Sequence, residues 1–180
     1  GMSLKDRGAI LPAGHFANWA FWYSKTGAFI SSTFYGATVP DWVTEFNQEK
    51  RYMPYITKGW SLLKTFSTYN ESLADDNQYE GKLNGEEPVF PYDLKAMYDK
   101  NQAGFIRETP FGNNLLAEFA TRAIEKEELG KDDITDFLTI SFSSTDYVGH
   151  ILGPRSMELQ DTYLRLDITI ADFLDYLDKT

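Results

Sequence analysis

The chain has 180 residues, with 17 lysines and arginines against 27 aspartates and glutamates, which gives a formal net charge of −10 at neutral pH. A charge of this sign repels nucleic acid and anionic membranes, and the composition therefore argues against both as partners. The absence of cysteine excludes disulfides, thiolate zinc sites and cysteine nucleophiles, and there are only two histidines. With 42% hydrophobic residues, the chain has enough apolar material for one folded domain.

The first half of the chain predicts a short strand, a hairpin, a helix and a loop. Residues 2–4 have the character of the end of a strand. Aromatic and β-branched residues on both sides of a glycine-containing turn predict a β-hairpin over residues 20–34. A proline and acidic residues at its start predict a helix over residues 41–50. Residues 67–91 are polar and interrupted by glycine and proline, so we expect a long surface loop there.

The last third of the chain is more regular. Asn113 is the expected N-cap of a helix that ends near Gly130. Residues 136–142 are mostly apolar and rich in β-formers, which predicts a strand covered on both faces. Residues 156–179 repeat apolar side chains every three or four positions and predict another helix. Helix, buried strand, loop and helix, in this order, indicate a layered α/β domain with a parallel sheet.

The predicted last helix has an apolar and a polar face. Its buried side is expected to carry Leu159, Tyr163, Leu166, Ile170, Phe173, Leu174 and Leu177. Its exposed side is expected to carry Glu158, Asp161, Arg165, Asp172 and Lys179.

A candidate metal pair follows the predicted strand. Residues 143–154 are expected to form a loop at the carboxyl end of that strand, where open α/β sheets bind ligands. Asp146 and His150, four positions apart in this loop, offer an oxygen and a nitrogen donor of the kinds that zinc accepts. From the residues alone the pair leaves two interpretations open, a metal site or a structural histidine held by hydrogen bonds.

A candidate anion site lies at the end of the first predicted strand. Lys5 and Arg7 flank an acidic residue there. In an acidic chain, an ammonium and a guanidinium fork in this position can grip a phosphoryl group, and their interaction strengthens as negative charge develops on it. The alternative is an exposed charged turn.

Taken together, residues 3–15 and 141–150, followed by Gly153 and Pro154, closely resemble the alkaline phosphatase superfamily, in particular bacterial periplasmic alkaline phosphatases related to nucleotide pyrophosphatase/phosphodiesterases. The resemblance extends over the whole chain. It implies an α/β fold, namely part of an α/β/α sandwich with a mostly parallel sheet, an inserted hairpin and a long loop. We expect residues 1–180 to form one partial domain, rich in insertions over about 20–110, with the helix, strand, metal loop and helix core over 111–180.

The resemblance also implies a zinc-dependent phosphomonoester hydrolase, in which a threonine or serine attacks a phosphate ester and zinc-bound water hydrolyses the phospho-enzyme. Asp146 and His150 match two ligands of one of its two zinc ions. Lys5 and Arg7 match the pair that contacts phosphoryl oxygens in the monoesterases. Neither the nucleophile nor the other zinc ligands have a counterpart in this chain. We therefore expect an internal fragment, inactive alone, of a parent protein that is periplasmic or exported.

Two further expectations concern partners. A second hypothesis for the function is a non-catalytic aromatic-rich binding module for glycans, prompted by Trp19, Trp22, Tyr23, Trp42 and Trp60. Core packing is the more ordinary role of such side chains. A fragment would also expose the edge of its sheet where strands are missing, which predicts a homodimer through that edge.

Overall fold

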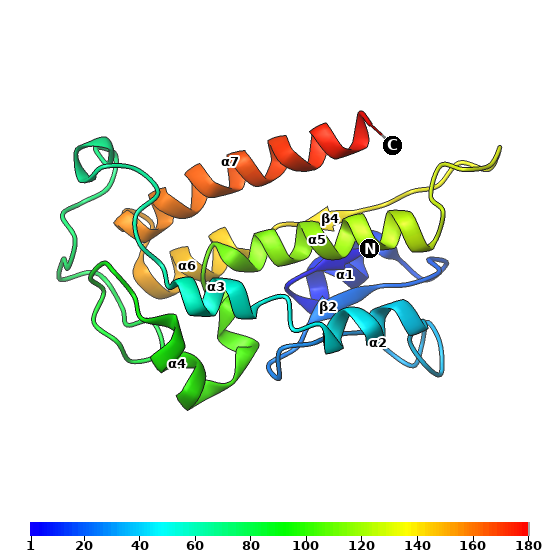
Figure 1. The fold of residues 1–180 in the computed structure, drawn as a ribbon, viewed down its shortest axis with the longest axis horizontal. Helices are drawn as coiled ribbons and strands as arrows, with labels where there is room; N and C mark the ends of the chain where they lie inside the picture. Colours follow the sequence, from blue (N-terminus) through cyan, green and yellow to red (C-terminus); the bar gives the residue numbers. More distant parts are fainter. Residues whose placement is uncertain (180) are drawn as a thin grey trace.

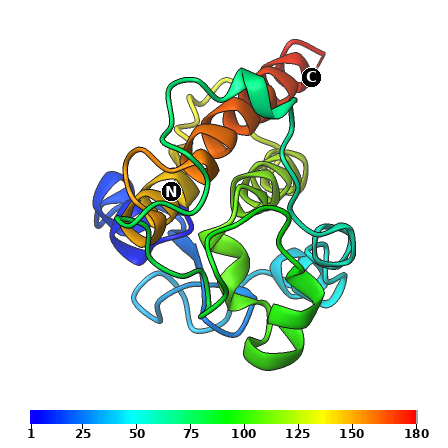
Figure 2. The same ribbon diagram turned by 90° about the vertical axis from the view of Figure 1, so that its left-hand side faces the viewer.

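A computed structural model describes residues 1–179, apart from the side chain of Asn101 (Figure 1). Helices surround a small sheet, and the longest helix, α7, runs along α5 (Figures 1 and 2). The elements in chain order are β1 (Met2–Ser3), α1 (Asp6–Ala13), β2 (Phe21–Tyr23), β3 (Phe29–Ile30), α2 (Asp41–Gln48), α3 (Met53–Lys58), η1 (Phe66–Thr68), α4 (Leu94–Asn101), η2 (Ala103–Glu108), α5 (Phe111–Lys126), β4 (Ile140–Ser141), α6 (Ser144–Leu152) and α7 (Met157–Leu177).

The four strands form one mostly parallel sheet in the order β3-β2-β1-β4. Met2 of β1 is opposite Phe21 of β2 and Ile140 of β4, and both pairings are parallel. β2 and β3 are antiparallel and form the hairpin predicted over residues 20–34. The predicted α/β class with a mostly parallel sheet is therefore confirmed, and the hairpin extends the sheet on the side of β2.

Helices α1 and α5 cover opposite faces of this sheet. Side chains along a strand point alternately to the two faces, so the contacts of neighbouring residues show which helix lies on each face. Ser3 of β1 faces α1, where Gly8 comes so close that a Cβ atom would lie 2.5 Å from the Ser3 hydroxyl oxygen. Phe21 faces the other way and packs edge-on against Phe119 of α5, with 5.5 Å between ring centroids. The absence of a side chain at Gly8 lets α1 lie directly on the sheet.

Aromatic rings form much of the core. Phe119 stacks on Phe29 with 3.8 Å between centroids, and it also contacts Phe21, Trp42 and Phe46. The aromatic residues that prompted the glycan hypothesis take part in this packing or a similar one, because Tyr23, Trp42 and Trp60 are buried and Trp19 and Trp22 are half-buried. These rings form no exposed platform.

Two predicted elements differ in detail from the structure, and one agrees with it. α2 agrees with the helix predicted over residues 41–50. α5, however, begins at Phe111, and the prediction of Asn113 as its N-cap is wrong. The strand predicted over residues 136–142 is reduced to two residues, both only half-buried, and Phe137 is exposed. The expected cover on both faces is therefore not found, and among the described residues no strand pairs with the outer edge of β4.

The predicted faces of α7 are only partly right. Leu159 and Phe173 pack against the core as expected. Asp172 and Lys179 are exposed as expected.

Other positions of α7 differ from the prediction. Tyr163 is 58% exposed and Leu174 is 54% exposed, and Ile170 and Leu177 are exposed as well. The buried residues of the helix are instead Met157, Glu158, Asp161, Thr162 and Thr169. The polar side is buried because its carboxylates accept hydrogen bonds from Trp60, Tyr69 and Tyr92.

The segment predicted as a loop over residues 67–91 has little regular structure, as expected. It contains the end of η1 and one isolated bridge between Leu83 and Glu86. Its first part is tied to α7, since the Ser72 amide donates to Gln160 and the Leu73 amide donates to the Arg155 carbonyl.

None of the helices that the structure describes combines the length and the apolar character needed to cross a membrane.

Candidate functional site

The candidate metal pair lies on a helix. Residues 144–152, expected to be a loop, form α6, so that prediction was wrong about the local structure. The helix still begins directly after β4, at the carboxyl end of the sheet. Positions four apart lie on one face of a helix, and the structure places His150 Nε2 3.4 Å from Asp146 Oδ1. The two donors therefore point to a common place.

The start of α6 is held by α5. The Ser144 amide donates a hydrogen bond of 3.1 Å to the side-chain oxygen of Asn113, which is buried. Asn113 therefore satisfies the N-terminus of α6 instead of capping its own helix. This contact fixes the first turn of α6, from which Asp146 projects.

Lys5 and Asp146 meet although they lie in distant parts of the sequence. Lys5 lies two residues after the end of β1, and its amide donates to the Ser3 hydroxyl at 3.1 Å. Its ammonium forms an ion pair with the Asp146 carboxylate. Arg7, in the first turn of α1, is exposed. The structure thus brings Lys5 of the predicted phosphate pair to the predicted metal pair, whereas Arg7 acts on Lys5 only through its charge.

The charge of Lys5 is subject to opposing influences. Its side chain is only 9% exposed, and this burial, with the guanidinium groups of Arg7 and Arg107, lowers the pKa of Lys5. The direct ion pair with Asp146 acts in the opposite direction. Because the carboxylate is in contact with the ammonium, we conclude that Lys5 is protonated at neutral pH.

Two residues of the site were missed by the sequence reasoning. Tyr147 follows Asp146 on α6, and Lys5 Nζ lies 4.3 Å from the centre of its ring. Arg107 of η2 lies over the same ring, with 5.1 Å between Cζ and the ring centre. Tyr147 was adjacent to a named residue, but Arg107 is in a region that the sequence indicates only as irregular. Spatial proximity alone reveals it.

The donor set fits part of a zinc site. A carboxylate oxygen and an imidazole nitrogen are ordinary zinc ligands, and a stable site needs three or four. Among the residues that the structure describes, no group of three or more histidines, cysteines, aspartates or glutamates could hold a metal ion. Asp146 and His150 therefore provide two ligands, and the remaining ligands would come from water or from another polypeptide segment.

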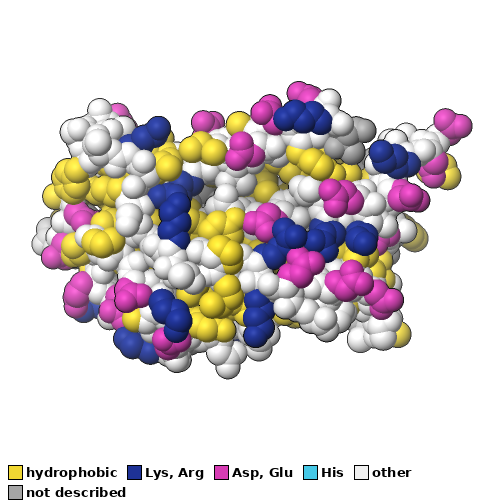
Figure 3. All heavy atoms as spheres, in the orientation of Figure 1, with side chains coloured by type: hydrophobic (Ala, Val, Ile, Leu, Met, Phe, Trp, Pro, Cys, Tyr) yellow, Lys and Arg dark blue, Asp and Glu magenta, His cyan; other side chains and the backbone are white. Residues whose placement is uncertain are grey.

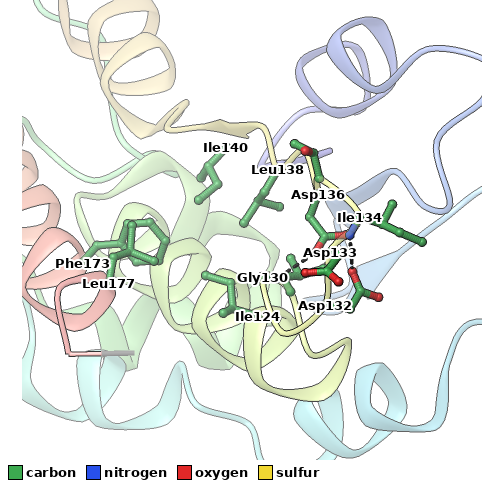
Figure 4. A pocket seen from close by; sticks show the side chains of 12 residues that line it. Ile124, Gly130, Asp132, Asp133, Ile134, Asp136, Leu138, Ile140, Phe173 and Leu177 are labelled. Carbon is green, nitrogen blue, oxygen red and sulfur yellow. Dashed lines mark hydrogen bonds between the residues drawn. The ribbon is translucent and has the colours of Figure 1, made fainter.

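A cavity in the structure lies away from this site. This cavity, of about 530 Å³, is bordered by the ends of α5 and α7, the segment before β4, and β4 itself. Figure 4 shows Ile124, Leu138, Phe173 and Leu177 facing into it, with the carboxylates of the 132–136 segment at one side. Neither Lys5 nor Asp146 lines it. We assign the chemistry to the ion-pair site, because its residues carry the charges and donors.

Comparison with known proteins finds relatives that match nearly the whole length of this chain. The sequence matches the family described as Type I phosphodiesterase / nucleotide pyrophosphatase over residues 5–180. It is 49% identical to alkaline phosphatase PafA of Elizabethkingia meningoseptica over 182 residues, and 49% identical to alkaline phosphatase PhoV of Synechococcus elongatus over 181 residues. It is 52% identical, over 183 residues, to a Myroides odoratus protein named a calcium-transporting ATPase.

The solved structure of wild-type PafA superimposes on this chain with a TM-score of 0.94 at 49% identity, over 99% of this chain and 35% of PafA. Each of the three relatives is matched over 99% of this chain but only 33% of its own length. The chain therefore spans about a third of the length of these relatives, and the expectation that it corresponds to part of such a phosphatase is confirmed. The chain belongs to the Type I phosphodiesterase / nucleotide pyrophosphatase family.

Proposed function

We propose that this chain is the part of a zinc-dependent phosphomonoester hydrolase that provides the phosphate clamp and two ligands of a zinc ion. The observation that carries the proposal is the meeting of Lys5 with Asp146 and His150 at the carboxyl end of the sheet. Relatives named alkaline phosphatases, nearly half identical across the whole chain, support the proposed activity.

In this proposal, the Lys5 ammonium and the Arg7 guanidinium bind phosphoryl oxygens. A phosphate monoester carries one more negative charge than a diester, so two cations favour the monoester. Both cations also stabilise the charge that grows on these oxygens in the transition state. Bound zinc would be held by Asp146 and His150 with ligands from outside this chain, and it would supply Lewis acidity.

The experiment is hydrolysis of phenyl phosphate by the longer polypeptide that carries this chain. We expect the rate to fall at least tenfold with a chelator, to return with zinc, and to fall similarly in a His150→Ala variant, because each change removes a metal contact. The matched control is His15→Ala, which removes the other histidine of the chain, exposed and beside Phe34. Equal rates in the parent protein and the His150→Ala variant would contradict the proposal.

We also propose that the parent protein is periplasmic or exported, as the resemblance implies. Phosphomonoesterase activity that fractionates with the cytoplasm of the native cells would contradict this location.

For the 180-residue chain alone, we propose a homodimer without phosphatase turnover. β4 is one of the two outer strands of the sheet, and the exposed Leu177 of α7 borders the same cavity as Ile140 of β4. The exposed Leu174 lies one helical turn before Leu177 on α7. Figure 3 shows further hydrophobic side chains at the surface of the molecule. An unpaired edge beside apolar surface favours pairing with a second copy. Sedimentation is expected to show a dimer that Leu174→Lys weakens at least tenfold. A strictly monomeric chain at high concentration would contradict the dimer.

A further inference from the structure

Arg107 reaches the phosphate clamp from a distant part of the chain. It lies in η2, whereas Lys5 follows β1 and Tyr147 belongs to α6. Arg107 Cζ and Lys5 Nζ lie 5.1 Å and 4.3 Å from the centre of the same tyrosine ring. A cation over an aromatic ring is attracted to its electron-rich face, so Tyr147 contacts both cations. The two cations are also close enough that Arg107 lowers the pKa of Lys5.

The guanidinium of Arg107 is not fully hydrogen-bonded. Its side chain is 16% exposed, and Nε is buried without a hydrogen-bond partner among the described residues. The carboxylate of Glu108 lies 3.6 Å from Nε, which is too long for a hydrogen bond. Burial also raises the pKa of Glu108, which weakens its value as a counter-charge. An arginine buried without its hydrogen bonds is costly unless a ligand completes them.

The backbone fixes the position of this arginine. A Cβ atom at Gly112 would lie 2.8 Å from Arg107 Cα and 2.6 Å from the Ser144 hydroxyl. η2 is thus in close contact with the start of both α5 and α6. Thr109 secures the end of η2, because its hydroxyl donates to the Ile106 carbonyl at 2.7 Å. The arginine is therefore carried by the same framework that positions Asp146.

Resting on the proposed function, we propose that Arg107 is a third cation of the phosphate clamp and makes it selective for doubly charged phosphoryl groups. Lys5, Arg7 and Arg107 are cations that interact within a chain of net charge −10. Such cations repel one another. An anion bound among them attracts each cation and so offsets this repulsion. The unpaired Nε of Arg107 and its full positive charge favour the ligand with the most acceptor oxygens and the highest charge, the terminal phosphate of a monoester.

The test is binding of inorganic phosphate and of dimethyl phosphate to the full 180-residue chain at pH 8. Inorganic phosphate is then mostly a dianion, and dimethyl phosphate is a monoanion of similar shape. Arg107→Met is expected to weaken phosphate about tenfold and dimethyl phosphate no more than about twofold, since a charge-assisted contact of this kind contributes about a factor of ten. Arg107→Lys is expected to restore most of the difference.

The matched control is Arg122→Met, because Arg122 also lies over an aromatic ring, that of Phe46, but is paired with Glu49. It is expected to change neither affinity. Equal weakening of both anions by Arg107→Met, with a lower melting temperature, would show a purely structural role and overturn the inference. If Lys5→Met weakens phosphate but Arg107→Met does not, the inference alone fails. If Lys5→Met has no effect, or the chain binds no phosphate, the proposed clamp fails and the inference with it.

Discussion

Replacing Asp161 by alanine is expected to lower the free energy of unfolding by about 3–5 kcal/mol, the largest stability effect in this chain. This carboxylate is completely buried. It accepts hydrogen bonds from the Trp60 indole at 2.8 Å, the Tyr69 hydroxyl at 2.5 Å and the Leu63 amide at 2.8 Å, and it pairs with Arg165. Its removal leaves these donors without a partner in the interior, where each unmet donor costs about 1–3 kcal/mol.

Thermal unfolding measures this effect. A loss of this size lowers the melting temperature by about 10 °C in a chain of this length. Asp161→Asn keeps one acceptor oxygen and is expected to lose about half as much. The control is Asp167→Ala, an exposed position on the same helix, with a change within about 0.5 kcal/mol. A fully stable Asp161→Ala variant would contradict the assignment of Asp161 as the anchor between α7 and the segment after α3.

The stability of the chain is expected to fall as pH rises from about 4.5 to about 7, because of Glu158. Burial raises the pKa of Glu158 from 4.5 to about 7, assisted by the nearby carboxylates of Glu80 and Asp75 and opposed by the hydrogen bond from Tyr92. One carboxylate oxygen accepts that bond at 2.5 Å, whereas the other is buried without a partner among the described residues. Burial also raises the pKa of Asp75 and Glu80, so these two carboxyl groups also lower the stability of the folded chain as the pH rises.

The sign follows from proton binding. In this window the folded chain retains a proton on Glu158 that the unfolded chain has released, so raising the pH favours unfolding. The shift corresponds to at most about 3 kcal/mol, fully expressed above pH 7. Urea unfolding of Glu158→Gln is expected to lose this pH dependence and to exceed the parent stability at pH 8, while the exposed Glu125→Gln keeps it. A Glu158→Gln variant less stable than its parent at pH 8 would contradict this account.

The sequence predicted where the helices lie better than it predicted which of their side chains are buried. The spacing of apolar residues located α5 and α7 because it follows directly from helix geometry. The same spacing assigned the faces of α7 only partly correctly, because Leu159 and Phe173 pack against the core but Tyr163 is exposed. Asp161 and Glu158 look solvent-exposed in a one-dimensional pattern, yet Trp60, Tyr69 and Tyr92 provide the donors that allow their burial. Such partners come from distant segments, so the spacing of apolar residues within one helix cannot predict them.

The same limit applies to the candidate site. Lys5, Asp146 and His150 were predicted from residue types and from resemblance, and the structure brings them together. Arg107 was missed because no local pattern marks it, and only the packing of η2 against α6 brings it to Tyr147. Residues 143–154 were predicted as a loop because they follow a predicted strand, but most of them form α6, whose start is held by the Asn113 side chain.

The most direct test of the central claim is a calorimetric zinc titration of this chain beside an Asp146→Ala, His150→Ala double variant, followed by titration of both with inorganic phosphate. We predict weak zinc binding to the parent chain that is lost in the double variant, because two ligands make an incomplete site. We also predict that zinc tightens phosphate binding only in the parent chain. Equal zinc binding by both proteins would contradict the claim that Asp146 and His150 form a metal site next to a phosphate clamp.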